Sequence, residues 1–248
     1  MKKNGFTLAE VLITLTIIGV IAALTLPSLN MRAQRSKVGP HLQKFINTMS
    51  NANEVILAEN QSNTLRSAFP VANAAARAAA TNRYIADLEG QIRGTRWLNN
   101  AGNLATVGTA VATNANRPTI TNYGANGAQN NTFNAFSAFR FDSGESMGIR
   151  LLPDAQQQRN NANGAHRGIF ANVLYDLDGF NTGANKLGID LFVFRIDNNG
   201  VIIPAGGTAE SSAGYNIVGN VCTEAAPGTG VNCAGHIADN NWRVDYQY

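Results

Sequence analysis

A single apolar run near the N-terminus constrains this chain more than any other feature. Residues 6–29 read FTLAEVLITLTIIGVIAALTLPSL. The run is about 24 residues long, and a helix needs roughly 20 apolar residues to cross the hydrocarbon core of a bilayer. Its one ionisable residue is Glu10. We therefore expect a transmembrane helix over residues 6–29, and a carboxylate inside such a helix indicates a functional position.

The charges beside the run predict its orientation. Lys2 and Lys3 precede it in a short polar leader, residues 1–5, and the positive-inside tendency places that end in the cytoplasm. The rest of the chain then lies outside the cytoplasm. Two simpler interpretations compete. A secretory signal usually has an apolar core of about 7–15 residues, which is shorter than this run, and an ordinary one-pass anchor leaves Glu10 unexplained.

Composition excludes several other classes of function. Charged residues make up 14% of the chain, against roughly 25% in an ordinary soluble domain, and the formal net charge is +3. Since the sequence has no block of Lys and Arg, we expect no dedicated nucleic-acid-binding domain. The chain has 2 Cys, and its 3 His, at His41, His166 and His236, lie far apart in sequence. This set argues against a metalloenzyme with nitrogen or sulfur ligands.

The start of the apolar run carries a specific motif. Residues 5–13 read GFTLAEVLI, and this segment resembles the N-terminal motif of type IV prepilins and type II secretion pseudopilins. The resemblance implies that a prepilin peptidase cuts between Gly5 and Phe6 and methylates the new amine of Phe6. It also implies that Glu10 occupies the signature acidic position of the family, and that Pro27 corresponds to a helix-bending proline of many pilins.

A charge pair gives this motif a physical role in assembly. Cleavage leaves the cationic amine of Phe6 at the start of a lipid-embedded helix that also holds the carboxylate of Glu10. Each charge is costly alone in a low dielectric, and pairing between the amine of one subunit and Glu10 of its neighbour relieves both. Methylation keeps the positive charge. We therefore expect Glu10 to fix the axial register of one subunit on the next.

The helical pattern continues beyond the membrane. Arg32, Arg35 and Lys37 form a polar stretch just outside it. We expect Gly39-Pro40 to kink or weaken the helix, because proline removes a backbone hydrogen bond and clashes with the preceding turn. Apolar residues then recur at helical spacing within residues 30–60 and predict an amphipathic helix packed on a sheet. These residues are Leu42, Phe45, Ile46, Met49, Ala52, Val55 and Ile56.

The middle of the chain changes in composition. Residues 61–135 are rich in Ala, Asn and Gly, and we interpret them as a variable insertion. The Ala-rich residues 69–80, with 84–88 as an extension, favour helix in part, whereas residues 98–129 have few large apolar groups and favour a loop. Such an insertion fits an adhesive or partner-facing surface, and it equally fits a solvated loop without a specific role.

Residues 136–248 predict a β-sheet head. Alternating apolar residues and turn signals mark successive strands, and Asn199-Gly200 is typical of a hairpin turn. The tail at residues 242–246 also alternates, so we expect it to add an edge strand or to pack on the head. With the resemblance, this predicts an α+β, pilin-like fold with a long N-terminal helix on a small antiparallel sheet. The expected strands are residues 138–142, 146–151, 168–176, 190–196 and 201–204.

An acidic, glycine-rich stretch joins two of these strands. Residues 176–190 read DLDGFNTGANKLGID and resemble an acidic loop of the major pseudopilins that binds a calcium ion. Oxygen ligands on a turn-rich loop suit Ca²⁺. On that interpretation the ligands are Asp176, Asp178 and Asp190, with Asn181 as a further candidate. The alternative is a structural loop whose Asp and Asn side chains cap their own turns.

Two cysteines lie near the C-terminus. Cys222 and Cys233 flank a Gly- and Pro-containing loop, and the expected topology places them outside the cytoplasm, where a disulfide persists. Pilins often close a C-terminal loop with a disulfide, so the resemblance implies that these two residues pair. The alternative is a reactive or metal-binding thiol pair, but no nearby set of His or further Cys completes it.

These features predict a structural subunit of a type IV pilus or a type II secretion pseudopilus, polymerised through its N-terminal helix. We expect it as a single-pass protein of the bacterial inner membrane, and later in a periplasmic or cell-surface filament. The expected partners are other pilin or pseudopilin subunits, the prepilin peptidase, an inner-membrane assembly platform with its ATPase, and membrane lipid, without nucleic acid. The alternative is a minor tip subunit that acts as an adhesin or binds a ligand or DNA.

An enzyme is the least supported interpretation. The sequence has no G-x-S-x-G segment, no Cys–His arrangement and no P-loop. Asp142 and Glu145 lie on an expected turn, and we interpret them as the solvated end of a hairpin. Apart from Ca²⁺, no cofactor is expected.

Overall fold

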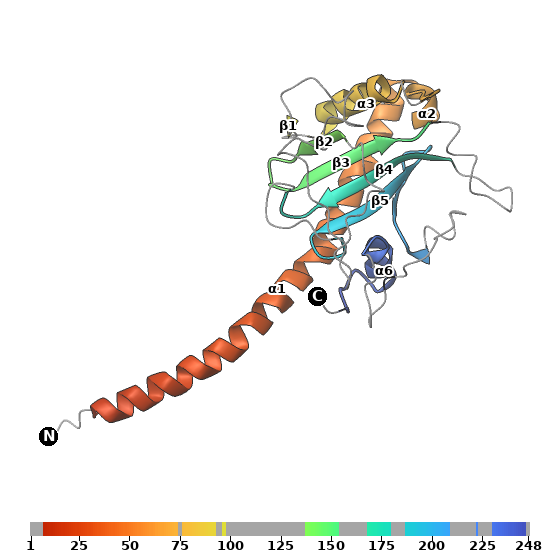
Figure 1. The fold of residues 1–248 in the computed structure, drawn as a ribbon. Helices are drawn as coiled ribbons and strands as arrows, with labels where there is room; N and C mark the ends of the chain where they lie inside the picture. The colour runs from red at the N-terminus through yellow and green to blue at the C-terminus, as the bar shows by residue number, and fades with distance from the viewer. Residues whose placement is uncertain are drawn as a thin grey trace.

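One helix dominates the computed structural model of this chain. The structure describes residues 7–73, 76–92, 96–97, 137–153, 168–179, 187–208, 222 and 230–246. Helix α1, Leu8–Glu59, is 52 residues long; its N-terminal half projects from the molecule and its C-terminal half lies against a β-sheet (Figure 1). The shorter helices are α2 Leu65–Ala68, α3 Arg77–Gln91 and α6 Cys233–Asp239.

The sheet is an antiparallel meander. The described residues form 6 strands whose order in the sheet follows their order in the chain. Each expected strand is confirmed, with shifts of at most two residues at its ends, and β1 is an addition that the sequence pattern did not indicate. The strands are β1 Arg96–Trp97, β2 Ser137–Arg140, β3 Ser146–Leu151, β4 Ile169–Asp176, β5 Leu191–Asp197 and β6 Ile202–Pro204.

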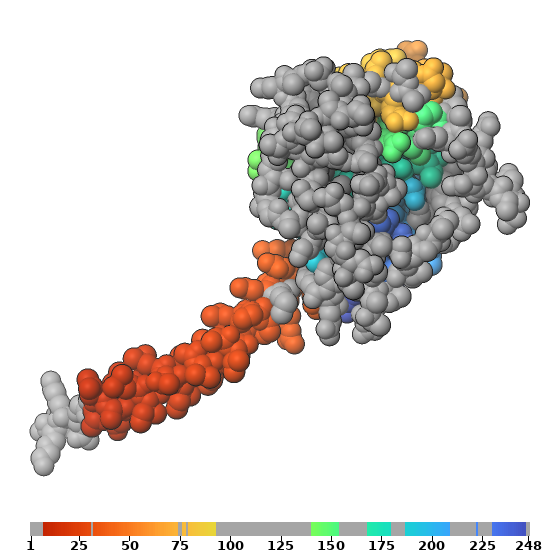
Figure 2. All heavy atoms as spheres, in the orientation of Figure 1, coloured from red at the N-terminus to blue at the C-terminus, as the bar shows by residue number. Residues whose placement is uncertain are grey.

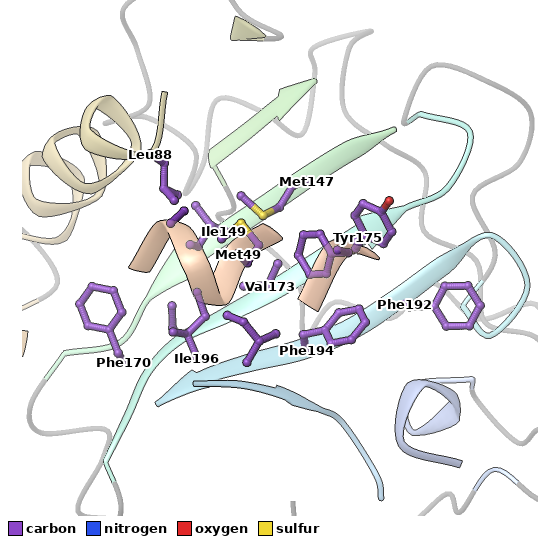
Figure 3. Packing of buried hydrophobic residues seen from close by; sticks show 14 of the residues in the cluster. Met49, Leu88, Met147, Ile149, Phe170, Val173, Tyr175, Phe192, Phe194 and Ile196 are labelled. Carbon is purple, nitrogen blue, oxygen red and sulfur yellow. The ribbon is translucent and has the colours of Figure 1, made fainter. Parts of the chain in front are cut away.

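The main core lies between α1 and one face of this sheet. Figure 3 shows side chains of β3, β4 and β5 gathered around Met49 of α1. Phe45 stacks on Tyr175 of β4, with ring centroids 4.1 Å apart. The predicted apolar stripe of α1 is therefore confirmed as a core face at Leu42, Phe45, Met49, Ala52 and Ile56. Val55 is an exception, because its side chain is 42% exposed.

Helix α1 continues through Gly39 and Pro40, where we expected it to kink or weaken. The structure gives Gly39 a different role. The C-terminal segment crosses α1 at this point, and a Cβ on Gly39 would lie 1.9 Å from the carbonyl oxygen of Trp242. Gly39 is thus the position at which the tail packs directly on the helix backbone. The tail does not form the strand that we considered, but its packing on the head is confirmed by the buried Tyr246.

We expect Gly39→Ala to destabilise the head by about 1–3 kcal/mol, even though alanine is the better helix former, because the added methyl group displaces the backbone at Trp242. Chemical denaturation of the purified protein measures the loss. Gly90→Ala in α3 is the matched control, since a Cβ there meets no atom within 4 Å, and it should be neutral or slightly stabilising. Equal stabilities of the two variants would contradict this role of Gly39.

The first part of the expected insertion belongs to the core. Leu65, Phe69 and Tyr84 are fully buried. The hydroxyl of Tyr84 donates a hydrogen bond to Asn53 Oδ1 at 2.6 Å, and Asn53 Nδ2 donates to the carbonyl of Gly200 at 2.8 Å. This chain of bonds joins α3, α1 and the turn between β5 and β6. The whole of the expected loop at residues 98–129 lies outside the described residues, as do residues 130–136.

The C-terminal segment closes the head near the point where α1 leaves it (Figure 1). Cys222 and Cys233 form a disulfide, so the predicted pairing is confirmed. Helix α6, which the sequence pattern did not indicate, starts at Cys233, and His236 Nε2 lies 2.7 Å from Asp245 Oδ1. A second apolar cluster on the sheet consists of Leu174, Leu187, Leu191, Val193 and Ala205.

Candidate functional site

The N-terminal half of α1 exposes an apolar surface that no part of the described chain covers. We call residues 8–29 the stem. Its large apolar side chains are exposed by 44% at Val11 to 81% at Leu8, and Figure 2 shows the stem standing clear of the head. Within the described residues, α1 is the one helix long and apolar enough to cross a membrane, and an 18-residue window of it has a mean hydropathy of 2.3. Such a surface requires lipid or neighbouring helices around it.

The Thr and Ser hydroxyls of the stem form hydrogen bonds within the helix. The hydroxyls of Thr14, Thr16 and Thr25 donate to backbone carbonyls of the preceding turn at 2.9, 2.8 and 2.9 Å. Ser28 donates in the same way to the carbonyl of Thr25 at 2.9 Å. These hydroxyl groups therefore need no hydrogen-bond acceptor from lipid or from a neighbouring helix. What remains at the surface is apolar, apart from the carboxylate at the N-terminal end of the stem.

That carboxylate belongs to Glu10, and the fold holds it in a capping box. Thr7 donates to Glu10 Oε2 from its backbone N–H and from its hydroxyl, both at 2.8 Å, and the backbone N–H of Glu10 donates to Thr7 Oγ1 at 3.3 Å. The T-x-x-E spacing signals this arrangement, but the motif alone did not lead us to Thr7. Gly5 and Phe6, the expected cleavage positions, lie outside the described residues.

A second acidic side chain lies where α1 meets the head. Glu145, which we expected at a solvated hairpin end, is only 4% exposed, so that interpretation is wrong for this residue. Its Oε1 lies 3.4 Å from His41 Nδ1 and 3.6 Å from Lys44 Nζ, and Ser143 donates a hydrogen bond to its Oε2. Glu145 lies in the turn that joins the paired strands β2 and β3, and its contacts with His41 and Lys44 place this turn against α1.

The charge of Glu145 is stabilised by its partners. Burial acts to raise the pKa of this carboxyl, but the Ser143 hydroxyl and the positive charges at Lys44 and His41 outweigh it, so the pKa lies below the usual value for glutamate. The folded state therefore binds this proton less tightly than the unfolded chain does. The resulting stabilisation is present above about pH 4.5 and is lost as the pH falls through the folded-state pKa.

We expect Glu145→Gln to lower the free energy of unfolding by about 1–3 kcal/mol at pH 7, because it removes the negative charge that pairs with Lys44 of α1. The difference between the variant and the wild type should shrink as the pH falls through the folded-state pKa of Glu145, because the wild-type side chain then becomes neutral as well. Denaturation curves over a series of pH values from neutral into the acid range measure it. A difference that stays the same across the series would contradict the ion-pair account.

The expected calcium ligands occupy the turn after β4 and the start of β5. Asp176 is buried, and its Oδ1 accepts hydrogen bonds from the backbone N–H groups of Asp178 and Gly179 at 3.1 and 2.9 Å. This is the turn-capping role of the alternative interpretation. Its other oxygen, Oδ2, is buried without a hydrogen-bond partner in the described part of the chain. The backbone N–H of Leu177 donates to the carbonyl of Asp190 at 2.9 Å, which brings both ends of the loop together.

The described residues do not form a metal site by themselves. Among them, no group of three or more His, Cys, Asp or Glu side chains is placed to hold a metal ion. Asn181, the further candidate, lies outside the described residues. The orphaned Asp176 Oδ2 is the one observation that favours an ion here. Calcium binding by Asp176, Asp178 and Asp190 therefore stays a prediction.

Burial raises the pKa of the Asp176 carboxyl to about 8; the side chain of Asp178 and the charge of Asp190 act in the same direction, and the hydrogen bond from the Asp178 backbone N–H opposes them. The folded state holds this proton more tightly than the unfolded chain, so without calcium the stability falls as the pH rises from about 4 to about 8. We expect the melting temperature in EDTA to fall by a few degrees more for the wild type than for Asp176→Asn over pH 5–8.

Calcium gives the second arm of this test. A bound Ca²⁺ neutralises the carboxylates, so millimolar calcium at pH 8 should raise the melting temperature of the wild type and leave Asp176→Asn unchanged. Asp142→Asn, a charge removal on the exposed turn between β2 and β3, is the matched control. Identical melting curves in EDTA and in calcium would contradict the calcium prediction and leave the turn-capping role.

The fold and the stem define the class of this protein. A long apolar N-terminal helix on a small antiparallel sheet, with a disulfide at the C-terminal loop, is a pilin-like α+β fold. Residues 1–26 match the family model described as the prokaryotic N-terminal methylation motif. This match supports the chain's recognition as a type IV pilin-like or pseudopilin subunit, a structural subunit that associates with others of its kind. No significant match was found among curated proteins or solved structures.

Proposed function

We propose that this chain is a filament subunit of a type IV pilus or a type II secretion pseudopilus, polymerised through α1 after cleavage between Gly5 and Phe6. The observation that carries the proposal is the stem: a fully exposed apolar helix surface in which Glu10 is the one ionisable group. The N-terminal methylation motif at residues 1–26 supports the processing step.

The stem fits two environments in succession. About 22 residues at 1.5 Å each give a length of about 33 Å, close to the roughly 30 Å of a hydrocarbon core. A subunit that leaves the bilayer must keep this surface away from water, because each Å² of exposed apolar surface costs about 25 cal/mol. Packing against the stems of neighbouring subunits provides that cover, so extraction and polymerisation are coupled.

Glu10 gives the stem its specificity. Apolar packing between smooth helices permits many axial registers, whereas a buried charge pair permits one. The capping box with Thr7 occupies Oε2 and keeps the carboxylate at the helix terminus. A carboxylate offers about four acceptor positions, so Oε1 can still receive an ammonium group. Cleavage creates an amine on Phe6, which is the cation closest to Glu10 in sequence. In a filament, the amine that pairs with Glu10 comes from the adjacent subunit.

Helix α1 connects the stem directly to the head. Because α1 continues without a break from the stem into the core, the head takes its orientation from the helix. The alternative role, a minor tip subunit that binds a surface, ligand or DNA, rests on the insertion at residues 61–135, of which residues 98–135 lie outside the described part of the chain. No described residue favours that role over the filament subunit.

Blocking the processing step tests this proposal. Gly5→Arg places a large cation at the expected cleavage site, and Gly90→Arg adds the same side chain to α3, where the position is exposed and open. The wild type and Gly90→Arg should appear in filaments sheared from cells, whereas Gly5→Arg should stay in the membrane with its leader attached. Equal amounts of Gly5→Arg in the sheared fraction would overturn the proposal.

A further inference from the structure

A band of positive charge follows the stem directly. We call Arg32, Arg35 and Lys37 the basic collar. Between Val11 and Asn53, the sequence of α1 contains no acidic residue. The collar therefore has no neutralising group on its own helix, although an i,i+4 carboxylate is the usual means of compensating an exposed helical cation. A surface that keeps its charge in this way is suited to an anionic partner.

The described residues of the head do not neutralise Arg32 or Lys37 either. Arg32 and Lys37 are exposed. The ion pairs found among the described residues join His41 and Lys44 to Glu145, and His236 to Asp245, so they involve neither of these two cations. Arg35 is half-buried and has a contact of its own, so Arg32 and Lys37 are the two exposed cations of the collar.

The depth of the collar matches the polar layer of a membrane. At 1.5 Å per residue, Arg32 lies about 5 Å and Lys37 about 12 Å beyond Leu29, the last apolar residue of the stem. A bilayer is about 40–45 Å thick with its headgroups and about 30 Å without them, so each headgroup layer is roughly 5–8 Å deep. Long basic side chains reach several ångströms along a helix, which brings both cations to the level of the lipid phosphates.

We propose that the basic collar binds the headgroup phosphates of anionic phospholipids on the outer face of the membrane and thereby sets the depth of the membrane-bound subunit. The proposal rests on the stem spanning the bilayer, which is part of the proposed function, but it requires no filament. Cleavage after Gly5 removes Lys2 and Lys3, the cations on the cytoplasmic side. In the processed subunit, the stem is then bounded by the amine of Phe6 on the cytoplasmic side and by the side-chain cations of the collar on the outer side.

A second copy of the chain is the other anionic partner to consider. The acidic residues of α1 nearest to Arg32 are Glu10 and Glu54, each 22 positions away in sequence. At 1.5 Å per residue, each of them lies about 33 Å from Arg32 along the helix axis. Two subunits side by side at the same depth in a membrane therefore do not bring these acids to the collar, whereas lipid phosphates surround it in every orientation.

Lipid selectivity of the full chain tests the proposal. The processed protein is reconstituted into bilayers of phosphatidylcholine and phosphatidylglycerol, and spin-labelled versions of the two lipids report their relative association with the protein. Since each cation near an anionic surface contributes about 1 kcal/mol, Arg32→Gln and Lys37→Gln should each reduce the preference for phosphatidylglycerol by up to about fivefold. The double variant should abolish it, and 1 M salt should abolish it in the wild type.

Arg83→Gln is the matched control, because it removes one exposed positive charge from α3, far along the chain from the collar. Its lipid preference should equal that of the wild type. A double collar variant that folds normally and keeps its preference within twofold would overturn the proposal. So would a double variant that loses filament assembly while its lipid preference is unchanged, since its cations would then contact other subunits. A failure of the wild type to form filaments affects only the proposed function, because the reconstituted subunit is measured without them.

Discussion

Replacing Glu10 by Gln or Val is expected to reduce incorporation into filaments at least tenfold and to leave membrane insertion intact. Removing one member of a buried charge pair costs about 3–5 kcal/mol, because the amine of the neighbouring subunit remains in a low dielectric without its partner. Insertion depends on the hydropathy of the stem, which these substitutions maintain or increase. Immunoblots of the membrane and of the sheared filament fractions measure both quantities.

Thr7→Val is the control for this experiment. It removes the hydroxyl that donates to Glu10 Oε2 and leaves the carboxylate in place. If the carboxylate acts through the neighbouring amine, Thr7→Val should assemble far better than Glu10→Gln. Filaments that take up Glu10→Gln at the wild-type level would rule out the charge pair as the determinant of register.

Loss of the disulfide is expected to lower the free energy of unfolding of the head by about 3 kcal/mol. Cys222 and Cys233 are 11 positions apart, and opening a loop of about this size releases that much chain entropy in the unfolded state. The effect is large because the bond joins Cys222 to the start of α6. Chemical denaturation of Cys222→Ser, Cys233→Ser and the double variant measures it.

Reduction of the wild type provides the comparison for these variants. The reduced protein and the double variant Cys222→Ser/Cys233→Ser should have similar stabilities, because both lack the same cross-link. Ala234 is buried beside the disulfide and Ala234→Ser controls for a buried hydroxyl. Stabilities of oxidised and reduced protein that agree within about 1 kcal/mol would show that the bond does not hold the loop.

The anchor and the strands were predictable because their signals are local. Hydropathy and one charge are enough to define the stem, and alternation of apolar residues with turn signals defines the strands to within one or two residues. The hairpin at Asn199-Gly200 is confirmed for the same reason, with Gly200 at φ 85°. In each case the physical cause lies within a few neighbouring residues.

Contacts between distant parts of the chain were not predictable from these patterns. Gly39 was interpreted as a helix-weakening residue because its neighbour is Pro40, whereas its role is to admit the backbone of Trp242. Glu145 was interpreted as a solvated turn residue, since its partners on α1 lie about a hundred positions earlier in the chain. The turn between β2 and β3 brings Glu145 to α1, and the packing of the C-terminal tail brings Trp242 to Gly39.

The sequence alone identifies the functional residue in the stem, but it leaves two interpretations open for the acidic loop. For Glu10, the motif identifies the residue, and the structure adds the capping box with Thr7. For Asp176, the sequence supports both calcium and turn capping, and the structure adds a buried oxygen without altering that choice. A ligand set that depends on a loop conformation cannot be derived from residue types alone.

The N-terminal residue of the native protein tests the central claim most directly. Mass spectrometry of subunits purified from filaments should identify Phe6 as the first residue, with a methylated amine and with residues 1–5 absent. A chain that still begins at Met1, or one that begins beyond Ala23 after removal of the stem, would contradict the account.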